Sequence, residues 1–176
     1  HDNVFEFADC HKFFNYVVEQ SNFKIGLTDS KARVQEKVFY ANYTPNHLND
    51  LKFLELLPIE FKYKYAYTTV ERTFINVVTP NGVYYPHDDS GTEAKYSLLY
   101  YLNMDWKLEW GADTLFLDPK TNEITKTVQC KPNRLIMFDA KIPHMIRPST
   151  IIAPQYRYSI SITPVSYTHL TLPTNA

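Results

Sequence analysis

A histidine and an aspartate separated by one residue can offer two ligands to the same metal ion. In the segment Tyr84-Tyr85-Pro86-His87-Asp88-Asp89, the side chains of His87 and Asp89 point to the same side if the chain is extended. Asp88 is the competing carboxylate, but it directly follows His87 and therefore points to the opposite face. A pair of this kind is also common in loops as a salt bridge, so it needs a third ligand before it indicates a metal site.

His144 is the candidate for that third ligand, because it starts another strand-like segment directly after Pro143. The plain alternative is a turn histidine whose ring is satisfied by hydrogen bonds. Two histidines and one carboxylate occupy one face of a first-row metal ion and leave the other coordination positions open. An Fe(II) oxygenase needs those positions for its co-substrate and for oxygen. We therefore expect His87, Asp89 and His144 to bind Fe(II).

A further segment, residues 156–163, alternates polar and apolar residues in the manner of a strand with two different faces. The polar face carries Arg157, Ser159, Ser161 and Thr163, and the apolar face carries Tyr156, Tyr158, Ile160 and Ile162. The polar face of an isolated strand ordinarily lies in solvent. In a barrel with its site inside, the planar guanidinium of Arg157 would suit a carboxylate, and a serine beside it could donate one more hydrogen bond.

Tyr101 is a candidate for binding the same carboxylate. It belongs to the strand-like segment 95–103, where it shares a face with Ser97, Leu99 and Asn103. A tyrosine at such a position is ordinarily a core residue, because its ring buries a large area whatever its hydroxyl does. A role in binding therefore depends on whether Tyr101 and Arg157 lie together.

Helices and then strands must hold these residues in place. A first helix has an apolar face made of Cys10, Phe13, Phe14, Val17 and Val18. A second helix is expected at about 46–57, where Pro58 ends it. After about Tyr67, short runs of Val, Ile, Thr, Tyr and Phe alternate with turn residues, which is typical of successive strands. We expect these strands at about 73–79, 95–103, 113–117, 124–129, 134–138, 144–147 and 156–163.

This order of elements predicts a mainly β fold with flanking helices, of the α+β class: a jelly-roll core (double-stranded β-helix, cupin-like) packed on N-terminal helices. We expect one domain over residues 1–164, with a helical part at 1–66 and the jelly-roll core at 67–164. Residues 20–60 could also form a lid or a wall for a substrate. Residues 165–176 follow neither the strand alternation nor a helical period, and we expect a C-terminal tail that is not native to the protein.

Composition and charge narrow the class of partner. The chain of 176 residues has 44% hydrophobic and 15% aromatic residues, which suits one globular domain rich in sheet. Its 18 Lys and Arg against 19 Asp and Glu give a net charge of −1, so no broad positive surface is expected for nucleic acid. Two cysteines without motif spacing favour a reducing, cytoplasmic setting, and no apolar run predicts a membrane span.

With His87, Asp89, His144 and Arg157 in this order, the chain resembles the 2-oxoglutarate/Fe(II)-dependent dioxygenase superfamily and, within it, the prolyl 4-hydroxylase-like branch. The likeness covers about Thr73 to Thr163 and includes three further segments that look like the family's successive core strands. These segments are Leu99–Trp106, Trp110–Leu115 and Lys131–Phe138. The same stretch is similar to the prolyl hydroxylases that act on hypoxia-inducible factor.

The resemblance implies a cofactor set and a reaction. Its iron ligands would be His87, Asp89 and His144, and its 2-oxoglutarate contacts would be Arg157, Tyr101 and Ser161, with Tyr84 lining the same pocket. Ser159, beside Arg157 on the polar face, is a further candidate contact from the strand pattern. Fe(II) and 2-oxoglutarate are the implied cofactors, with ascorbate as a further candidate and O2 as the second co-substrate. The expected reaction hydroxylates an unactivated C–H bond of a peptide or small molecule, with a prolyl residue as the first candidate, and releases succinate and CO2. No catalytic residue beyond the metal ligands is required.

Three departures from the family pattern concern the substrate more than the chemistry. Val77 or Val78 stands where an upstream tyrosine is expected, and Ala112 replaces the second glycine of a Trp-Gly-Gly segment. Collagen-type prolyl hydroxylases also have lysine in the place of Arg157. Two other functions stay open on the residues alone: a cupin-type metal enzyme that does not use 2-oxoglutarate, and a non-catalytic jelly-roll binding module.

Overall fold

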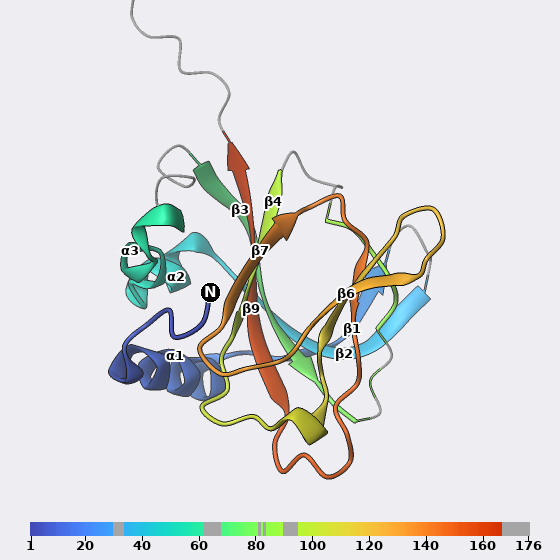
Figure 1. The fold of residues 1–176 in the computed structure, drawn as a ribbon. Coiled ribbons are helices and arrows are strands. Elements are labelled where there is room, and N and C mark those ends of the chain that lie inside the picture. The colour runs from blue at the N-terminus through green and yellow to red at the C-terminus, as the bar shows by residue number, and fades with distance from the viewer. Residues whose placement is uncertain (30–33, 62–67, 81, 83, 90–94, 167–176) are drawn as a thin grey trace, which may run out of the picture.

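Two antiparallel sheets and a layer of helices make up the fold (Figure 1). The computed structural model describes residues 1–29, 34–61, 68–80, 82, 84–89 and 95–166. In chain order the elements are α1 (Phe7–Gln20), β1 (Lys24–Asp29), β2 (Val34–Tyr43), α2 (Pro45–Asp50), α3 (Phe53–Leu56), β3 (Thr68–Val78), β4 (Tyr96–Tyr101), η1 (Leu108–Trp110), β5 (Thr114–Leu117), β6 (Ile124–Val128), β7 (Leu135–Asp139), β8 (His144–Ile146) and β9 (Arg157–Ser166). The mainly β class with flanking helices is confirmed.

The strand order confirms the jelly-roll core. The larger sheet has six strands in the order β1-β2-β3-β9-β4-β7, and the smaller has three in the order β6-β5-β8. Each strand expected after residue 67 is present, with ends shifted by a few residues. β9 continues to Ser166, beyond its expected end at Thr163 and into the expected tail. Residues 167–176 of that tail lie outside the described residues.

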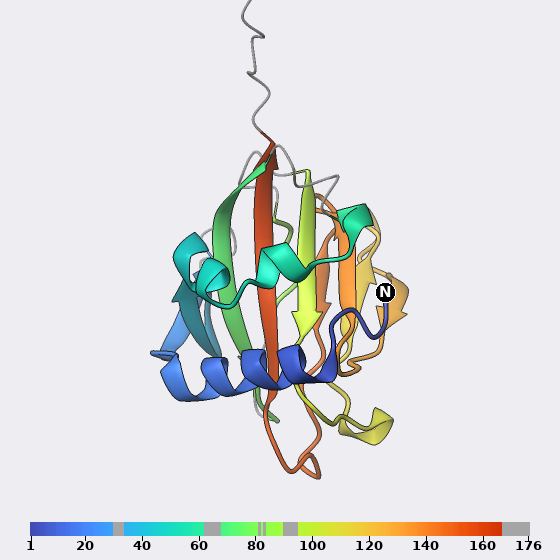
Figure 2. The same cartoon turned by 90° about the vertical axis from the view of Figure 1, so that its left-hand side faces the viewer.

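The helices cover one face of the larger sheet, which we call the outer face (Figure 2). Phe13 and Val17 of α1 are fully buried in a core that includes Ile160 and Ile162 of β9. Cys10 is buried in the same core and Phe14 packs against it, as expected. Val18 is 42% exposed, so the apolar face of α1 is narrower than the sequence pattern predicts.

The N-terminal part is less helical than expected. β1 (24–29) and β2 (34–43) pair as antiparallel strands, so the prediction of a helical part over 1–66 is wrong for these residues. β2 joins the larger sheet by pairing along 39–43 with β3, a contact between distant segments that local periodicity does not reveal. The second expected helix is present as α2 and α3, which are separated at Lys52, where φ is 55°.

The inner face of the larger sheet points toward the smaller sheet and carries the polar side of β9. Directly paired residues share a face, so the register defines two rows across β2, β3, β9 and β4. We call them the inner rows: Tyr40, Asn76, Ser159 and Tyr101 form one, and Asn42, Phe74, Ser161 and Leu99 form the other. Both rows are buried at β4 and open toward β2, where Asn42 is exposed. Arg157 and Ser159 are 0% exposed, so the polar face of β9 does not lie in solvent.

Tyr100→Phe is expected to lower the free energy of unfolding by about 1–2 kcal/mol, because it removes the hydrogen bonding of a buried hydroxyl. The buried Tyr100 hydroxyl lies 3.2 Å from Asn133 Oδ1 and 3.4 Å from Cys10 Sγ. Denaturant unfolding followed by circular dichroism measures the change. Tyr156→Phe is the control, because that side chain is 51% exposed. Equal losses in the two variants would contradict a specific contribution from the buried hydroxyl.

Candidate metal and co-substrate site

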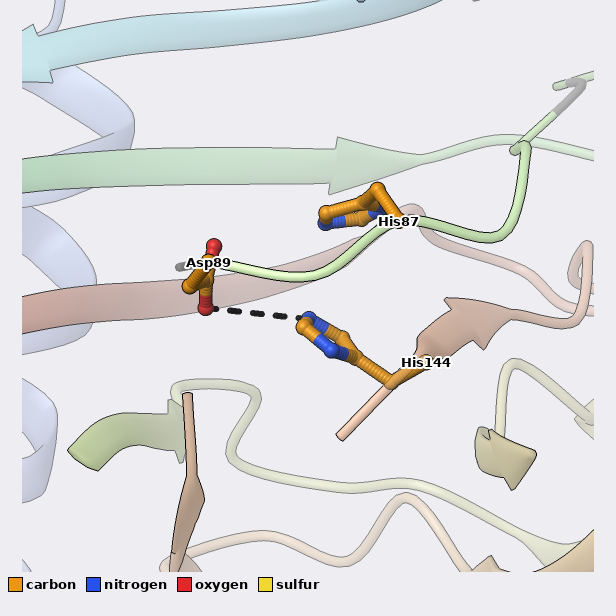
Figure 3. A group of neighbouring side chains, drawn as sticks. All are labelled: His87, Asp89 and His144. Atoms are coloured by element: carbon orange, nitrogen blue, oxygen red, sulfur yellow. Dashed lines mark ion pairs between the residues drawn. The ribbon is translucent and has the colours of Figure 1, made fainter. Parts of the chain in front are cut away.

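Backbone hydrogen bonds hold the two candidate histidines side by side. His87 lies in an extended segment after β3, and His144 begins β8 (Figure 3). The amide of His87 donates to the carbonyl of His144 over 3.0 Å, and the amide of His144 donates to the carbonyl of His87 over 2.8 Å. Their ring centroids are 4.5 Å apart, so both rings are close enough to contact one metal ion.

Asp89 completes a cluster of three candidate ligands. Its amide donates to the carbonyl of Ala140 over 2.8 Å, which ties this segment to the turn between β7 and β8. One ligand atom from each of His87, Asp89 and His144 lies within 4.8 Å of the others. Within the described parts of the chain this is the cluster of His, Cys, Asp or Glu suited to a metal ion, and Asp88 does not belong to it.

Both histidines present the ring nitrogen that a metal would use. Nδ1 of His87 lies 3.1 Å from the carbonyl of Tyr85, and Nδ1 of His144 lies 3.0 Å from the carbonyl of Ile142. A carbonyl only accepts, so each Nδ1 carries the proton and each Nε2 keeps its lone pair. Burial and the neighbouring His87 ring lower the pKa of His144, against the Asp89 carboxylate, which favours the neutral ring that metal binding requires.

Two side chains that the sequence pattern does not single out orient the Asp89 carboxylate. Arg72 Nη2 donates to Asp89 Oδ1 over 3.2 Å, and Ser97 Oγ donates to Asp89 Oδ2 over 2.5 Å. Oδ2 is also the oxygen that faces His144, with Nε2 at 3.8 Å (Figure 3). Ser97 could have been noticed from its place on the Tyr101 face of β4. Arg72 gives no local signal, because its role depends on how β3 lies beside Asp89.

Arg157 is a buried cation without a hydrogen-bond partner among the described residues. It is 0% exposed, and its Nε, Nη1 and Nη2 atoms make no hydrogen bond within the structure as described. The nearby Cys130 brings no negative charge, because burial raises the pKa of its thiol to about 11. An unpaired buried guanidinium is costly, and a bound carboxylate would supply both the charge and the hydrogen bonds it lacks. The donor set at Arg157 therefore fits a carboxylate ligand.

Tyr101 and the serines surround this guanidinium. The centre of the Arg157 guanidinium lies 4.7 Å from the centroid of the Tyr101 ring, so the two residues lie together as the binding hypothesis requires. The Tyr101 hydroxyl pairs with Thr114 Oγ1 at 2.9 Å. Ser159 follows on the same face of β9, and its buried Oγ has no partner among the described residues. Ser161 is half-buried one position further along that face.

Tyr84 and Val78 close the same region from the end of β3. The Tyr84 hydroxyl accepts a hydrogen bond from the amide of Thr79 at 2.9 Å and donates to the carbonyl of Val77 at 3.3 Å. Its ring belongs to the apolar cluster of the inner face, together with Val78 and Tyr101. Val78 is therefore the valine that lies in the inner cluster near Tyr84 and Tyr101. Because valine is smaller than the tyrosine expected at this position, the apolar surface beside Tyr101 differs from the one that the family pattern predicts.

In the ranges that the structure describes, no helix is long and apolar enough to cross a bilayer.

The family model described as the 2OG-Fe(II) oxygenase superfamily matches residues 73–162, just over half of the chain. That range contains all three candidate metal ligands and Arg157. No curated protein sequence matches the chain.

Solved structures resemble the fold over nearly the whole chain. A prolyl hydroxylase from Trichoplax adhaerens, in complex with a peptide fragment of the hypoxia inducible factor oxygen degradation domain, is 17% identical with a TM-score of 0.67, covering 94% of this chain and 82% of that one. A Pseudomonas putida prolyl-4-hydroxylase is 14% identical with a TM-score of 0.62, covering 95% and 91%. The non-heme alpha-ketoglutarate-dependent epimerase SnoN of nogalamycin biosynthesis is 12% identical with a TM-score of 0.63, covering 94% and 76%. At these identities the likeness concerns the fold.

Proposed function

The chain belongs to the 2OG-Fe(II) oxygenase superfamily, and from this premise we propose that it hydroxylates an unactivated C–H bond, with a prolyl residue of a peptide as the first substrate to test. The enzyme is a non-haem dioxygenase that uses Fe(II), 2-oxoglutarate and O2. The cupin-type reading without 2-oxoglutarate and the binding-module reading are therefore set aside. The substrate and the hydroxylation outcome are the parts that we propose, because SnoN, an epimerase, has a similar fold.

The residues present fit the cofactors. Nε2 of His87, Nε2 of His144 and one oxygen of Asp89 are the ligand atoms we propose for the iron, since both Nδ1 atoms are engaged by carbonyls. Fe(II) bound there would activate O2, of which one oxygen atom enters the substrate C–H bond and the other enters succinate as 2-oxoglutarate loses CO2. The protein itself positions the reactants and excludes water.

The single observation that carries the co-substrate assignment is the buried guanidinium of Arg157, which has no hydrogen-bond partner within the residues that the structure describes. We propose that it binds the far carboxylate of 2-oxoglutarate, with Ser159, Ser161 and Tyr101 as further donors. β4 supports this arrangement, because Ser97, which contacts Asp89, and Tyr101, which contacts Arg157, lie on its same face. One face of one strand thus links the proposed iron ligand to the proposed anchor.

The inner rows indicate where a substrate would lie. They run from the buried Tyr101 and Leu99 at β4 outward to Tyr40 and Asn42 at β2, and they mix aromatic rings with amide side chains. The Tyr40 and Phe74 rings meet edge to face at 6.2 Å. Aromatic rings suit a proline ring, and amide groups can bond to a peptide backbone. This composition supports a peptide substrate over a small apolar metabolite.

Anaerobic titration of the Fe(II)-loaded protein with 2-oxoglutarate is the test of the proposed site. We expect a weak visible charge-transfer band that saturates at one equivalent, because the keto acid chelates the iron. His87→Ala should not show the band, whereas His47→Ala should, because His47 lies in α2 and stacks on Tyr43 at 4.8 Å. Iron-replete protein without a band would contradict the site.

The substrate is tested separately by succinate formation. We expect peptides that contain proline to increase 2-oxoglutarate turnover above the level without substrate, and mass spectrometry should find one added oxygen on the proline. Matched peptides with alanine in place of proline are the control. Turnover that responds equally to both peptides would reject prolyl hydroxylation and leave the dioxygenase assignment intact.

A further inference from the structure

We propose that Arg72 is a positioning residue that restricts the Asp89 carboxylate to one metal-binding oxygen. The inference rests on the proposed role of Asp89 as an iron ligand and adds a residue that the sequence pattern does not mark. Arg72 belongs to β3, next to the inner rows, and its Nη2 is 3.2 Å from Asp89 Oδ1.

The two oxygens of Asp89 have different surroundings. Oδ2 is 3.8 Å from His144 Nε2 and accepts the hydrogen bond of Ser97 Oγ at 2.5 Å. Oδ1 accepts the hydrogen bond of the Arg72 guanidinium. Oδ2 therefore faces the histidines that would share the metal, and Oδ1 is turned toward a fixed cation. Ser97 can stay on Oδ2 when a metal binds there, because a carboxylate oxygen has two lone pairs.

Arg72 is itself held in place. Its guanidinium carbon lies 5.0 Å from the centroid of the Phe74 ring, which is also on the inner face of β3. The stacked ring limits the rotation of the guanidinium, so the hydrogen bond to Asp89 keeps its direction. The Arg72 side chain is 40% exposed and Asp89 is 8% exposed, so the pair lies at the border between the buried site and solvent.

The restriction matters because carboxylates bind metals through one oxygen or through both. A carboxylate that used both oxygens would occupy a coordination position that the co-substrate or oxygen needs in an octahedral site. A charged hydrogen bond to Oδ1 opposes that second bond. Arg72 would thereby keep Asp89 in one orientation and leave the remaining coordination positions of the metal for the co-substrate and oxygen.

Mn(II) titration of the full chain, followed by the electron paramagnetic resonance signal of free Mn(II), tests the inference without catalysis. Arg72→Met keeps the length of the side chain and removes the donor, and we expect it to weaken Mn(II) binding by about 10–100-fold, as loss of an outer partner of a metal ligand usually does. Arg72→Gln keeps an amide donor and should lose only part of this affinity. Arg147→Ala is the matched control, because Arg147 faces Asp113 at 3.9 Å and contacts no proposed ligand.

A second readout separates positioning from general stability. Circular dichroism first establishes that each variant is folded, and 2-oxoglutarate is then titrated into Fe(II)-saturated protein. Weaker 2-oxoglutarate binding in Arg72→Met than in Arg147→Ala supports the restriction of Asp89. If Arg72→Met does not fold, a several-fold loss of Mn(II) affinity in Arg72→Gln supports the inference and parent-like affinity overturns it.

The outcomes distinguish this inference from the proposed function. Mn(II) affinity in Arg72→Met equal to that of the parent chain and of Arg147→Ala overturns the role of Arg72 and leaves the metal site standing. A parent chain that does not bind Mn(II) saturably overturns both.

Discussion

Replacing His144 by alanine is expected to abolish iron binding and dioxygenase activity together. The remaining His87 and Asp89 would hold Fe(II) by two ligands, and loss of a direct ligand should exceed the roughly 10–100-fold cost of losing an outer partner. The prediction is measured by loading each protein anaerobically with Fe(II), removing free metal, and determining bound iron and succinate formation. We expect iron well below stoichiometry and turnover at the level of the blank.

His11→Ala is the control for this variant. His11 lies exposed on α1, where its Nδ1 is 3.1 Å from Asn15 Nδ2, away from the candidate metal site. It should keep stoichiometric iron and full turnover. The backbone pairing of residues 87 and 144 does not depend on the imidazole, so His144→Ala should still fold. Stoichiometric iron in folded His144→Ala would remove His144 from the ligand set.

Local alternation was enough to predict which side chains of the candidate site lie together. His87 and Asp89 share a side of an extended segment, and Arg157 and Ser159 share a side of β9, because side chains repeat every two residues along a strand. The sequence of β9 alone does not show whether its polar face lies in solvent or in the interior. The answer depends on the smaller sheet, which lies opposite that face. The structure buries Arg157 completely, which local pattern cannot predict.

Contacts between distant segments account for what the sequence did not predict. The strand pair β1 and β2 owes its place to the pairing of β2 with β3, and Arg72 owes its role to the position of β3 beside Asp89. Neither depends on a local period. The short helices α2 and α3 were expected as one helix, because the left-handed residue Lys52 has no sequence signal of the kind that glycine gives.

Ala112 adopts a backbone conformation that glycine adopts more readily than alanine. The family pattern has glycine here, and Ala112 has a φ of 61°, a left-handed conformation that costs an alanine roughly 1–2 kcal/mol. Ala112 is fully buried in the cluster with Tyr101 and Trp110, and packing there holds it in place. The departure therefore adds local backbone strain at Ala112, in the segment before β5.

Arg157→Ala is expected to leave iron bound and to weaken 2-oxoglutarate binding by about thirty-fold or more. Losing a charged hydrogen-bond partner in a buried site costs roughly 2–5 kcal/mol. Anaerobic titration of the visible band measures the dissociation constant, and succinate formation measures the Michaelis constant. Arg147→Ala should bind 2-oxoglutarate like the parent chain, because that side chain is 54% exposed and faces Asp113. An unchanged dissociation constant would reject Arg157 as the anchor.

Arg157→Met separates the role of the charge in binding from its effect on folding. Without an anion the guanidinium is buried and has no hydrogen-bond partner in the described part of the chain, so an apolar side chain of similar length should not destabilise the ligand-free protein and is expected to stabilise it. At a hundredfold excess over the parent dissociation constant, 2-oxoglutarate should then stabilise the iron-loaded parent chain by about 2.7 kcal/mol and a variant that binds it thirty-fold more weakly by only about 0.9 kcal/mol. If ligand-free Arg157→Met were instead less stable than the parent, Arg157 would have a structural partner, and the argument from its missing counter-charge would fail.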